Sequence, residues 1–325
     1  MYNGFLPEIS TDDTIDRVSA RGFAFGYLGG GLQLVLAAAL IVFHEQLGLS
    51  ETTAQRLGIA MAGLWWAGFA TFSFTRLGDW GSAGTIPERY ESMANWAALT
   101  RLGFSRTLAT TRQIGRHKHL LLFVVAFVLY NDGVQTVIAM TSAYASQTLE
   151  LSTTTILTMF LLVQFVAFPG ALLVARFADR VGTKRAISMT LVVWVLVAIG
   201  AFLLPVGAAV PFYALGVVTG FVLGGVQALS RSLYGSMIPE EASAEFFGFF
   251  AVFSRFSAIW GPLLFALIAT TTGSARNAIV SVAGFFILGG VLLAFVDVDE
   301  ARSTRETWRF DEPGSGRVRS NDPHS

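Results

Sequence analysis

The chain alternates between long apolar stretches and shorter polar segments. Eight of the apolar stretches are long enough to cross a bilayer as a helix, which takes roughly 17 to 25 residues. They cover residues 22–43, 57–74, 120–144, 156–175, 186–204, 210–229, 246–268 and 277–296. This pattern predicts an all-α membrane protein with eight transmembrane helices.

The polar segments divide the predicted helices into two groups. Residues 1–74 hold two helices, residues 75–119 form a cytoplasmic linker, and residues 120–296 hold the other six. Apolar and basic residues at near-helical spacing over 96–113 predict either a helix lying on the inner leaflet or a linker docked on the helix ends. The polar segment 297–325 contains Pro and Gly and is predicted to be a disordered cytoplasmic tail.

Composition narrows the class of protein further. Hydrophobic residues make up 53% of the 325 residues and charged residues only 14%, whereas soluble proteins carry roughly 25% charged residues. The absence of cysteine excludes disulfides and thiolate metal sites. The histidines lie in predicted loops or the tail, and the phosphate-binding motif G-x-x-x-x-G-K-[ST] is absent. We expect no metal, no cofactor and no nucleic-acid partner.

The distribution of Lys and Arg indicates how the helices are oriented. With the N-terminus inside, nineteen basic residues fall in inside segments and two, Arg56 and Arg276, in outside segments. Cytoplasmic loops of membrane proteins carry such an excess. Both termini are therefore predicted to lie in the cytoplasm, and the cell membrane is the expected location.

Two charged residues fall inside apolar stretches. Asp132 lies twelve residues beyond Leu120, and Arg255 lies nine residues beyond Phe246. At 1.5 Å per residue these positions are roughly 18 and 14 Å from the inner ends of their helices. Both depths fall in the middle of a hydrocarbon core about 30 Å thick, where a charge is costly and marks a candidate functional site.

An acid and a base at similar depths suggest a mechanism. Asp132 and Arg255 can neutralise each other in an empty cavity and separate when a solute arrives. A zwitterionic solute such as an amino acid would replace both partners, or Asp132 would take up a proton and couple transport to a proton gradient. The alternative interpretation is a permanent structural ion pair that faces the interior of the bundle.

Neutral polar side chains also fall within the predicted spans, at Asn131, Gln135, Gln164 and Gln227. Asn131 and Gln135 are four residues apart and share a helix face, so a polar stripe beside Asp132 is predicted to face the cavity. Gln164 and Gln227 are interpreted mainly as hydrogen-bond partners between helices, with solute binding as the alternative.

Glycine and proline predict local features of the helices. The Pro-Gly and Gly-Pro pairs at 169–170 and 261–262 are predicted to kink their helices and to free carbonyl groups locally. Gly216, Gly220 and Gly224 recur every four residues. A face of this kind lets helix backbones approach closely.

The short basic loop between the fourth and fifth predicted spans reads Asp179-Arg180-Val-Gly182-Thr-Lys184-Arg185. Gly182 permits a tight left-handed turn, and a carboxylate near the C-terminal end of a helix needs cationic neighbours. Such a charge-paired loop could latch one conformation and release another. The alternative is that these charges only set the topology.

The loop pattern D-R-x-G-x-[KR]-[KR] resembles the cytoplasmic loop motif of the major facilitator superfamily, in the copy that belongs to the C-terminal six-helix half. The superfamily's usual glycine four residues before the aspartate is Ala175 here. Segments 130–136 (YNDGVQT), 224–232 (GGVQALSRS), 245–250 (EFFGFF) and 256–262 (FSAIWGP) resemble the vacuole effluxer family, the group similar to autophagy-related protein 22. Residues 2–8 (YNGFLPE) resemble the end of that family's fourth helix.

The resemblance implies a fold of twelve helices in two six-helix halves, with solute bound between the halves. The chain supplies a major-facilitator-like C-terminal half and two helices of the N-terminal half. We therefore expect that the first four helices are missing, and that the chain as written does not transport because half of the cavity wall is absent.

These observations favour a secondary active transporter of small polar solutes that works by alternating access and is not an enzyme. The resemblance suggests efflux, with amino acids among the solutes. A coupled proton and membrane lipid are the other expected partners. Two alternatives are a membrane scaffold or sensor without transport, and a membrane-embedded enzyme that modifies lipids, for which the loops show no metal-ligand spacing.

Overall fold

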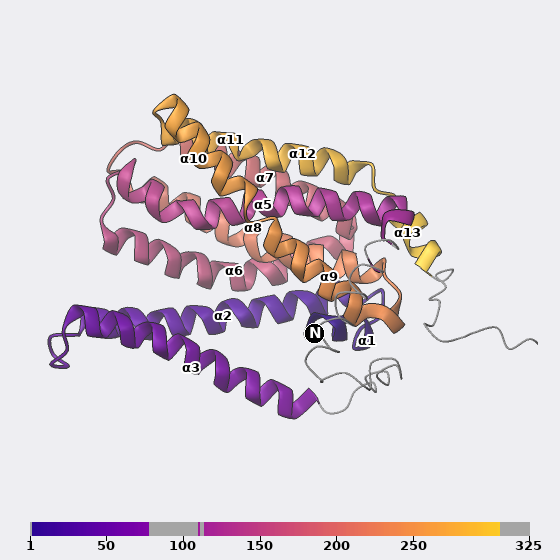
Figure 1. Ribbon diagram of the computed structural model, residues 1–325, viewed down its shortest axis with the longest axis horizontal. Helices are drawn as coiled ribbons and strands as arrows, with labels where there is room; N and C mark the ends of the chain where they lie inside the picture. Colours follow the sequence, from indigo (N-terminus) through magenta and orange to yellow (C-terminus); the bar gives the residue numbers. More distant parts are fainter. Residues whose placement is uncertain (1, 78–109, 111–113, 306–325) are drawn as a thin grey trace, which may run out of the picture.

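The computed structural model describes residues 2–77, 110 and 114–305, and all regular structure within these residues is helical (Figure 1). The helices that the figures label are α1 (Phe5–Glu8), α2 (Ile15–Val42), α3 (Glu51–Leu77), α5 (Lys118–Gln147), α6 (Thr153–Val181), α7 (Thr183–Leu203), α8 (Ala209–Ser236), α9 (Ser243–Phe256), α10 (Trp260–Thr272), α11 (Ala275–Ser281), α12 (Ala283–Ala294) and α13 (Val298–Arg305).

Eight helical segments of the described chain are long and apolar enough to cross a membrane, which confirms the prediction. Helices α2, α3, α5, α6, α7 and α8 each form one span. The seventh span consists of α9 and α10, and the eighth consists of α11 and α12. The chain is therefore an all-α, multi-pass integral membrane protein.

Helices α6 and α8 approach closely because glycines line their contact. A Cβ atom at Gly170 would overlap the Phe221 carbonyl, and a Cβ atom at Gly224 would overlap the Ala167 carbonyl. The repeated glycines of α8 therefore allow the two helix backbones to approach closely, as predicted from the sequence. Pro169 leaves α6 continuous from Thr153 to Val181.

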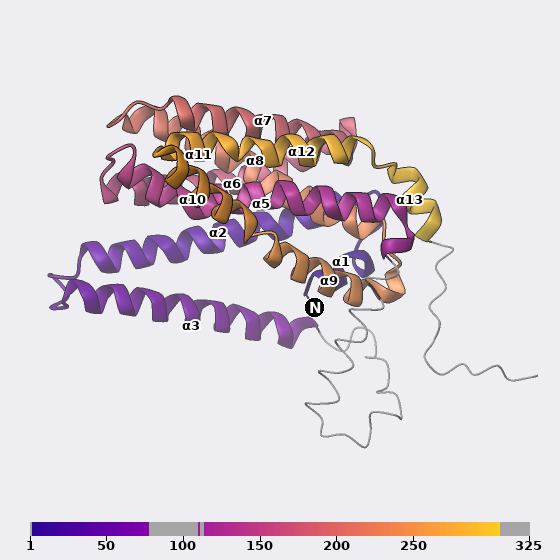
Figure 2. The ribbon, with the colours of Figure 1, turned by 45° about the horizontal axis from the view of Figure 1, so that its top comes forward.

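The two N-terminal spans form one flank of the six-helix bundle. Helix α2 lies along α6 and α8, and α3 lies beyond α2 (Figures 1 and 2). Helix α5 packs against α12 on the opposite side of the bundle. Contacts of α2 with the bundle, together with smaller contacts of residues 2–8 with α8 and α9, thus join the two predicted groups of helices.

One end of the bundle carries α1, α13, the start of α2 and the turn between α6 and α7, and we call it the polar end (Figure 1). Every ion pair found in the described part of the chain lies there. These ion pairs are Arg17–Asp179, His119–Glu300 and Arg305–Asp12.

The structure bears differently on the two polar segments, the linker and the C-terminal tail. The linker helix expected at 96–113 lies outside the described residues, apart from position 110. Residues 298–305, expected to belong to a disordered tail, instead form α13. The Asp297 carboxylate accepts the backbone N–H groups of Asp299 and Glu300 at the start of this helix, and Arg305 at its end binds Asp12.

Candidate functional site

The seventh span is interrupted near its middle, where α9 ends at Phe256 and α10 begins at Trp260. Asn131 of α5 binds the groups on one side of the interruption. Its amide donates to the Ser257 hydroxyl at 2.6 Å and to the Ser254 carbonyl at 3.3 Å. Asn131 therefore satisfies acceptors at the C-terminal end of α9, where backbone carbonyls lack partners within the helix.

Asp132 binds the other side of the interruption. Its Oδ1 accepts the backbone N–H of Gly261, in the first turn of α10, at 2.9 Å. The N-terminal end of a helix has unpaired N–H groups and a partial positive charge. Because Asp132 is only 2% exposed, this helix end is what stabilises its carboxylate. A Cβ atom on Gly261 would overlap the Thr136 hydroxyl, so the position requires glycine.

Arg255 does not form an ion pair with Asp132 in the described part of the chain. The side chain of Arg255 is exposed and has no hydrogen-bond partner among these residues. It belongs to the last turn of α9, where the partial negative charge of the helix end favours a cation. The acid and the base are thus each compensated by an end of the interrupted helix instead of by each other. Their roles in transport stay predictions.

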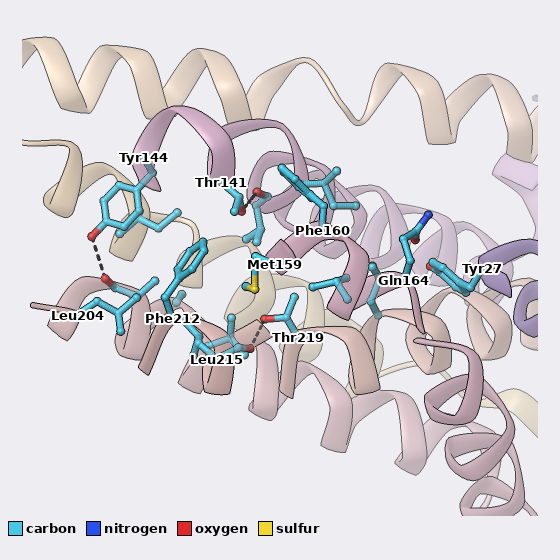
Figure 3. A pocket seen from close by; sticks show the side chains of 18 of the residues that line it. Tyr27, Thr141, Tyr144, Met159, Phe160, Gln164, Leu204, Phe212, Leu215 and Thr219 are labelled. Carbon is cyan, nitrogen blue, oxygen red and sulfur yellow. Dashed lines mark hydrogen bonds between the residues drawn. The ribbon is translucent and has the colours of Figure 1, made fainter. Parts of the chain in front are cut away.

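A cavity of about 470 Å³ lies between α2, α5, α6, α7, α8 and α11 (Figure 3). It begins at Tyr27, ten residues beyond Arg17 and so roughly 15 Å from the polar end, and it reaches Tyr144 near the far end of α5. No described lining residue is charged. The polar side chains in its wall are Tyr27, Thr141, Tyr144, Gln164, Thr219 and Gln227.

Most hydroxyl groups of the cavity wall are already bound within the protein. Thr141 and Thr219 donate to carbonyls of their own helices, and Tyr144 donates to a carbonyl of α7 (Figure 3). The Tyr27 hydroxyl donates to Oε1 of Gln227 at 2.5 Å. The amide nitrogen of Gln227 therefore keeps its hydrogens for another partner.

Gln164 has no hydrogen-bond partner among the described residues. Its amide nitrogen lies against Gly30, three residues beyond Tyr27 on the same face of α2. Figure 3 shows Gln164 and Tyr27 as neighbours at one end of the cavity. Together with Gln227, Gln164 offers unused amide groups to a ligand at that end. The bond from Tyr27 makes Gln227 a link between α2 and α8, as expected from the sequence, whereas Gln164 forms no such link with a described residue.

The other predicted polar residues do not line this cavity. Asn131 and Asp132 are occupied at the interruption of the seventh span. Gln135 is half-buried and makes no hydrogen bond with a described residue. Of the predicted polar stripe on α5, Asn131 and Asp132 therefore bind the broken helix, and Gln135 has no partner among the described residues.

The loop motif connects four helices, α2, α6, α7 and α12, at the polar end. Asp179 pairs with Arg17 of α2 at 3.0 Å. Gly182, at φ +89°, makes the left-handed turn between α6 and α7. The Lys184 ammonium donates to two carbonyls at and just beyond the end of α12, at 2.8 and 2.7 Å. Arg180 and Arg185 are exposed and bind no other described residue.

Sequence reasoning missed Asp16, in the first turn of α2. Its carboxylate accepts hydrogen bonds from Thr183 at 2.6 Å and from Ser232, so it joins α2 to α7 and α8. Close by, Arg231 of α8 donates to the side chain and the carbonyl of Ser19. The only sequence signal was an acidic residue just before an apolar stretch, because the two hydroxyl partners lie far away in the chain.

Comparisons with known proteins agree on one family. The model of the family described as "Vacuole effluxer Atg22 like" matches residues 7–306. The chain is 30% identical over 297 residues to the uncharacterized MFS-type transporter YxiO of Bacillus subtilis. It is 28% identical over 312 residues to autophagy-related protein 22 of Yarrowia lipolytica, and 28% identical over 309 residues to that of Cryptococcus neoformans.

These matches cover most of this chain but only part of each relative. They cover 91% of this chain and 66% of the Bacillus subtilis protein. For the two fungal proteins they cover 89% and 91% of this chain and 52% and 55% of the relative. The chain thus spans about half to two thirds of the length of these curated relatives.

Proposed function

We propose that this chain, which belongs to the Atg22-like vacuole effluxer family, carries out secondary active transport of small polar solutes by alternating access. The proposal includes a location in the cell membrane, both termini in the cytoplasm, efflux as the direction and proton coupling through Asp132. The family membership supports transport in general, and the site supports the mechanism.

The observation that carries the proposal is the interruption of the seventh span between α9 and α10. Discontinuous helices at mid-membrane are a recurring feature of secondary transporters, whose half-helix ends bind solutes and ions. Asp132 lies fourteen residues beyond the start of α5, or roughly 21 Å along the helix. Among the described residues this carboxylate accepts one hydrogen bond, from the Gly261 N–H, so it keeps further lone pairs for a proton or a solute.

The cavity supports the choice of solute. Its described wall offers amide groups and aromatic rings but no charge. This wall suits the uncharged polar part and the apolar part of a small solute, since an unpaired charge is costly in such a site. Among amino acids, we expect leucine and glutamine to be transported faster than lysine or glutamate, because the last two add a side-chain charge to the α-ammonium and α-carboxylate that all four carry.

The polar end supports alternating access. There α2 is joined to the bundle through Asp16, Arg17 and Ser19, whereas the cavity occupies the other half. With the termini in the cytoplasm, this is a conformation closed toward the cytoplasm. Transport would then require these polar contacts to break while the cavity closes from the opposite side.

The test is flux of labelled leucine and lysine through vesicles that hold the protein encoded by the complete reading frame. Asp132→Asn keeps an oxygen acceptor for the Gly261 N–H but removes the charge. We expect it to lower leucine flux at least tenfold and to abolish dependence on a pH gradient, with thermal unfolding little changed.

Asp13→Asn is the matched control, because Asp13 is exposed and binds no other described residue. It should transport as the unmodified protein does. Unchanged flux in Asp132→Asn would remove Asp132 from the mechanism, and absence of protein-dependent flux for every solute would contradict transport itself.

A further inference from the structure

A groove of about 490 Å³ lies between α2 and α6 at the polar end, separate from the cavity. Two pairs of arginines face each other across it. Arg17 and Arg21 are four residues apart on α2, and Arg176 and Arg180 are four residues apart on α6. Residues at this spacing share a helix face, and all four arginines line the groove.

The groove carries a net positive charge. Its acidic residue, Asp179, pairs with Arg17 at 3.0 Å. The side chains of Arg21, Arg176 and Arg180 donate no hydrogen bond to any described residue. Guanidinium groups stay charged at all physiological pH values and match phosphate oxygens with paired N–H donors. Three unused cations therefore line the groove.

The position of the groove matches the headgroup layer of a membrane. Arg17 is the third residue of α2, and Arg180 is the last residue but one of α6, so both stand where a span meets the interface. Beyond them toward the membrane centre, α2 and α6 expose apolar side chains. Phe25 is 67% exposed and meets the ring of Phe168 edge-on at 6.4 Å, and Leu173 is 45% exposed.

We propose that this groove binds the phosphate of an anionic phospholipid, with an acyl chain lying along the exposed face that contains Phe25, Phe168 and Leu173. Basic pockets between transmembrane helices at an interface favour anionic headgroups. A free phosphate ion has the same phosphate chemistry as the lipid headgroup but no acyl chain to contact the apolar face. A phospholipid is therefore the favoured ligand.

A bound lipid would bridge α2 and α6. Its phosphate would contact Arg21 of α2 and Arg176 of α6, which have no other described partner. It would therefore hold α2 on α6 in the conformation seen here and raise the temperature of unfolding, as any ligand of the folded state does.

The test uses the full chain in a neutral detergent, titrated with phosphatidylglycerol, phosphatidylcholine or inorganic phosphate. Thermal unfolding and native mass spectrometry give the stabilisation and the lipid affinity. We expect phosphatidylglycerol to raise Tm and phosphatidylcholine and phosphate to leave it nearly unchanged. The double variant R21Q/R176Q should bind phosphatidylglycerol about thirtyfold more weakly, because each arginine near an anionic lipid contributes about fivefold.

The control R56Q/R116Q removes the same charge from exposed positions outside the groove and should bind the lipid as the unmodified chain does. Circular dichroism checks that both double variants keep their helical content. Equal binding of the two lipids, or an affinity of R21Q/R176Q within twofold of the unmodified chain, would overturn the proposal. So would a full Tm shift from phosphate alone, because the apolar face would then contribute nothing. These outcomes leave the transport proposal untouched.

Discussion

The polar end and the cavity half hold α2 in different ways. At the polar end, Asp16 and Arg17 bind α6, α7 and α8 through hydrogen bonds and an ion pair. In the cavity half, the one hydrogen bond found between α2 and the described part of the bundle runs from Tyr27 to Gln227, and the backbone of Gly30 lies against Gln164. Polar contacts near an interface can be exchanged for water at modest net cost. Helix α2 is therefore secured at the end where water can replace its partners.

The largest effect is expected at the broken helix, where α5 contacts the first turn of α10. Gly261→Ala places a Cβ atom against the Thr136 hydroxyl and Asp132 Oδ1. We expect the free energy of unfolding to fall by about 1–3 kcal/mol, as in other overpacked sites, measured by denaturant titration in micelles. Gly248→Ala is the control, since nothing lies within 4 Å of its Cβ position. Equal stability of the two variants would contradict the tight contact at Gly261.

The next largest effect is expected at the polar end. Asp16→Ala leaves the Thr183 hydroxyl without its acceptor among the described residues and removes one of the two acceptors of Ser232. A loss of about 1–2 kcal/mol in the free energy of unfolding is expected, the lower part of the range for unpaired groups, because Ser232 keeps the Leu229 carbonyl. Asp13→Ala, three residues earlier and exposed, should change it little. If both variants unfold alike, Asp16 does not secure α2.

A smaller effect is expected for the ion pair of Arg17 and Asp179, whose side chains are 59% and 25% exposed. A double-mutant cycle with Arg17→Gln and Asp179→Asn should give a coupling free energy of about 0.2–1 kcal/mol. Because the pair is partly in water, the coupling should shrink as salt is added. A coupling that does not respond to salt would indicate that the pair is screened from solvent.

The smallest effect is confined to α13. The backbone N–H groups of Glu300 and Asp299 lower the pKa of Asp297 below its usual value of 3.8. A carboxylate with a lowered pKa in the folded state stabilises that state above its unfolded pKa, and the contribution disappears as the pH falls through the folded value. The docking of α13 should therefore weaken below about pH 4.

The chain has no cysteine, so a nitroxide on Ser303→Cys reports the mobility of α13 specifically. Asp297→Ala removes the acceptor of both backbone N–H groups, so it should raise that mobility at pH 6 and reduce its change with pH. Asp299→Ala serves as the control because the Asp299 carboxylate is exposed and binds no other described residue. Mobility in Asp297→Ala equal to that of the unmodified chain would show that Asp297 does not hold the helix.

The spans were predictable because membrane crossing is a local property of chain length and hydropathy. Asp132 was recognisable for the same reason, since a carboxylate in an apolar stretch needs a partner. Which partner it has depends on tertiary structure, and the Gly261 N–H is 129 residues away. Helix periodicity also gave no sign that Arg255 would be exposed. Helix α13 was missed because a polar segment of eight residues is helical only when its cap and Arg305 have partners.

The hydrogen bonds of Asn131 and Asp132 tie three helices into one mechanical unit. Successive residues of a helix point about 100° apart, so these two neighbours reach α9 and α10 separately. If α5 turned or slid by one residue, both side chains would leave their acceptor and donor together. We therefore expect α5, α9 and α10 to move as one rigid body, with any hinge located elsewhere in the molecule.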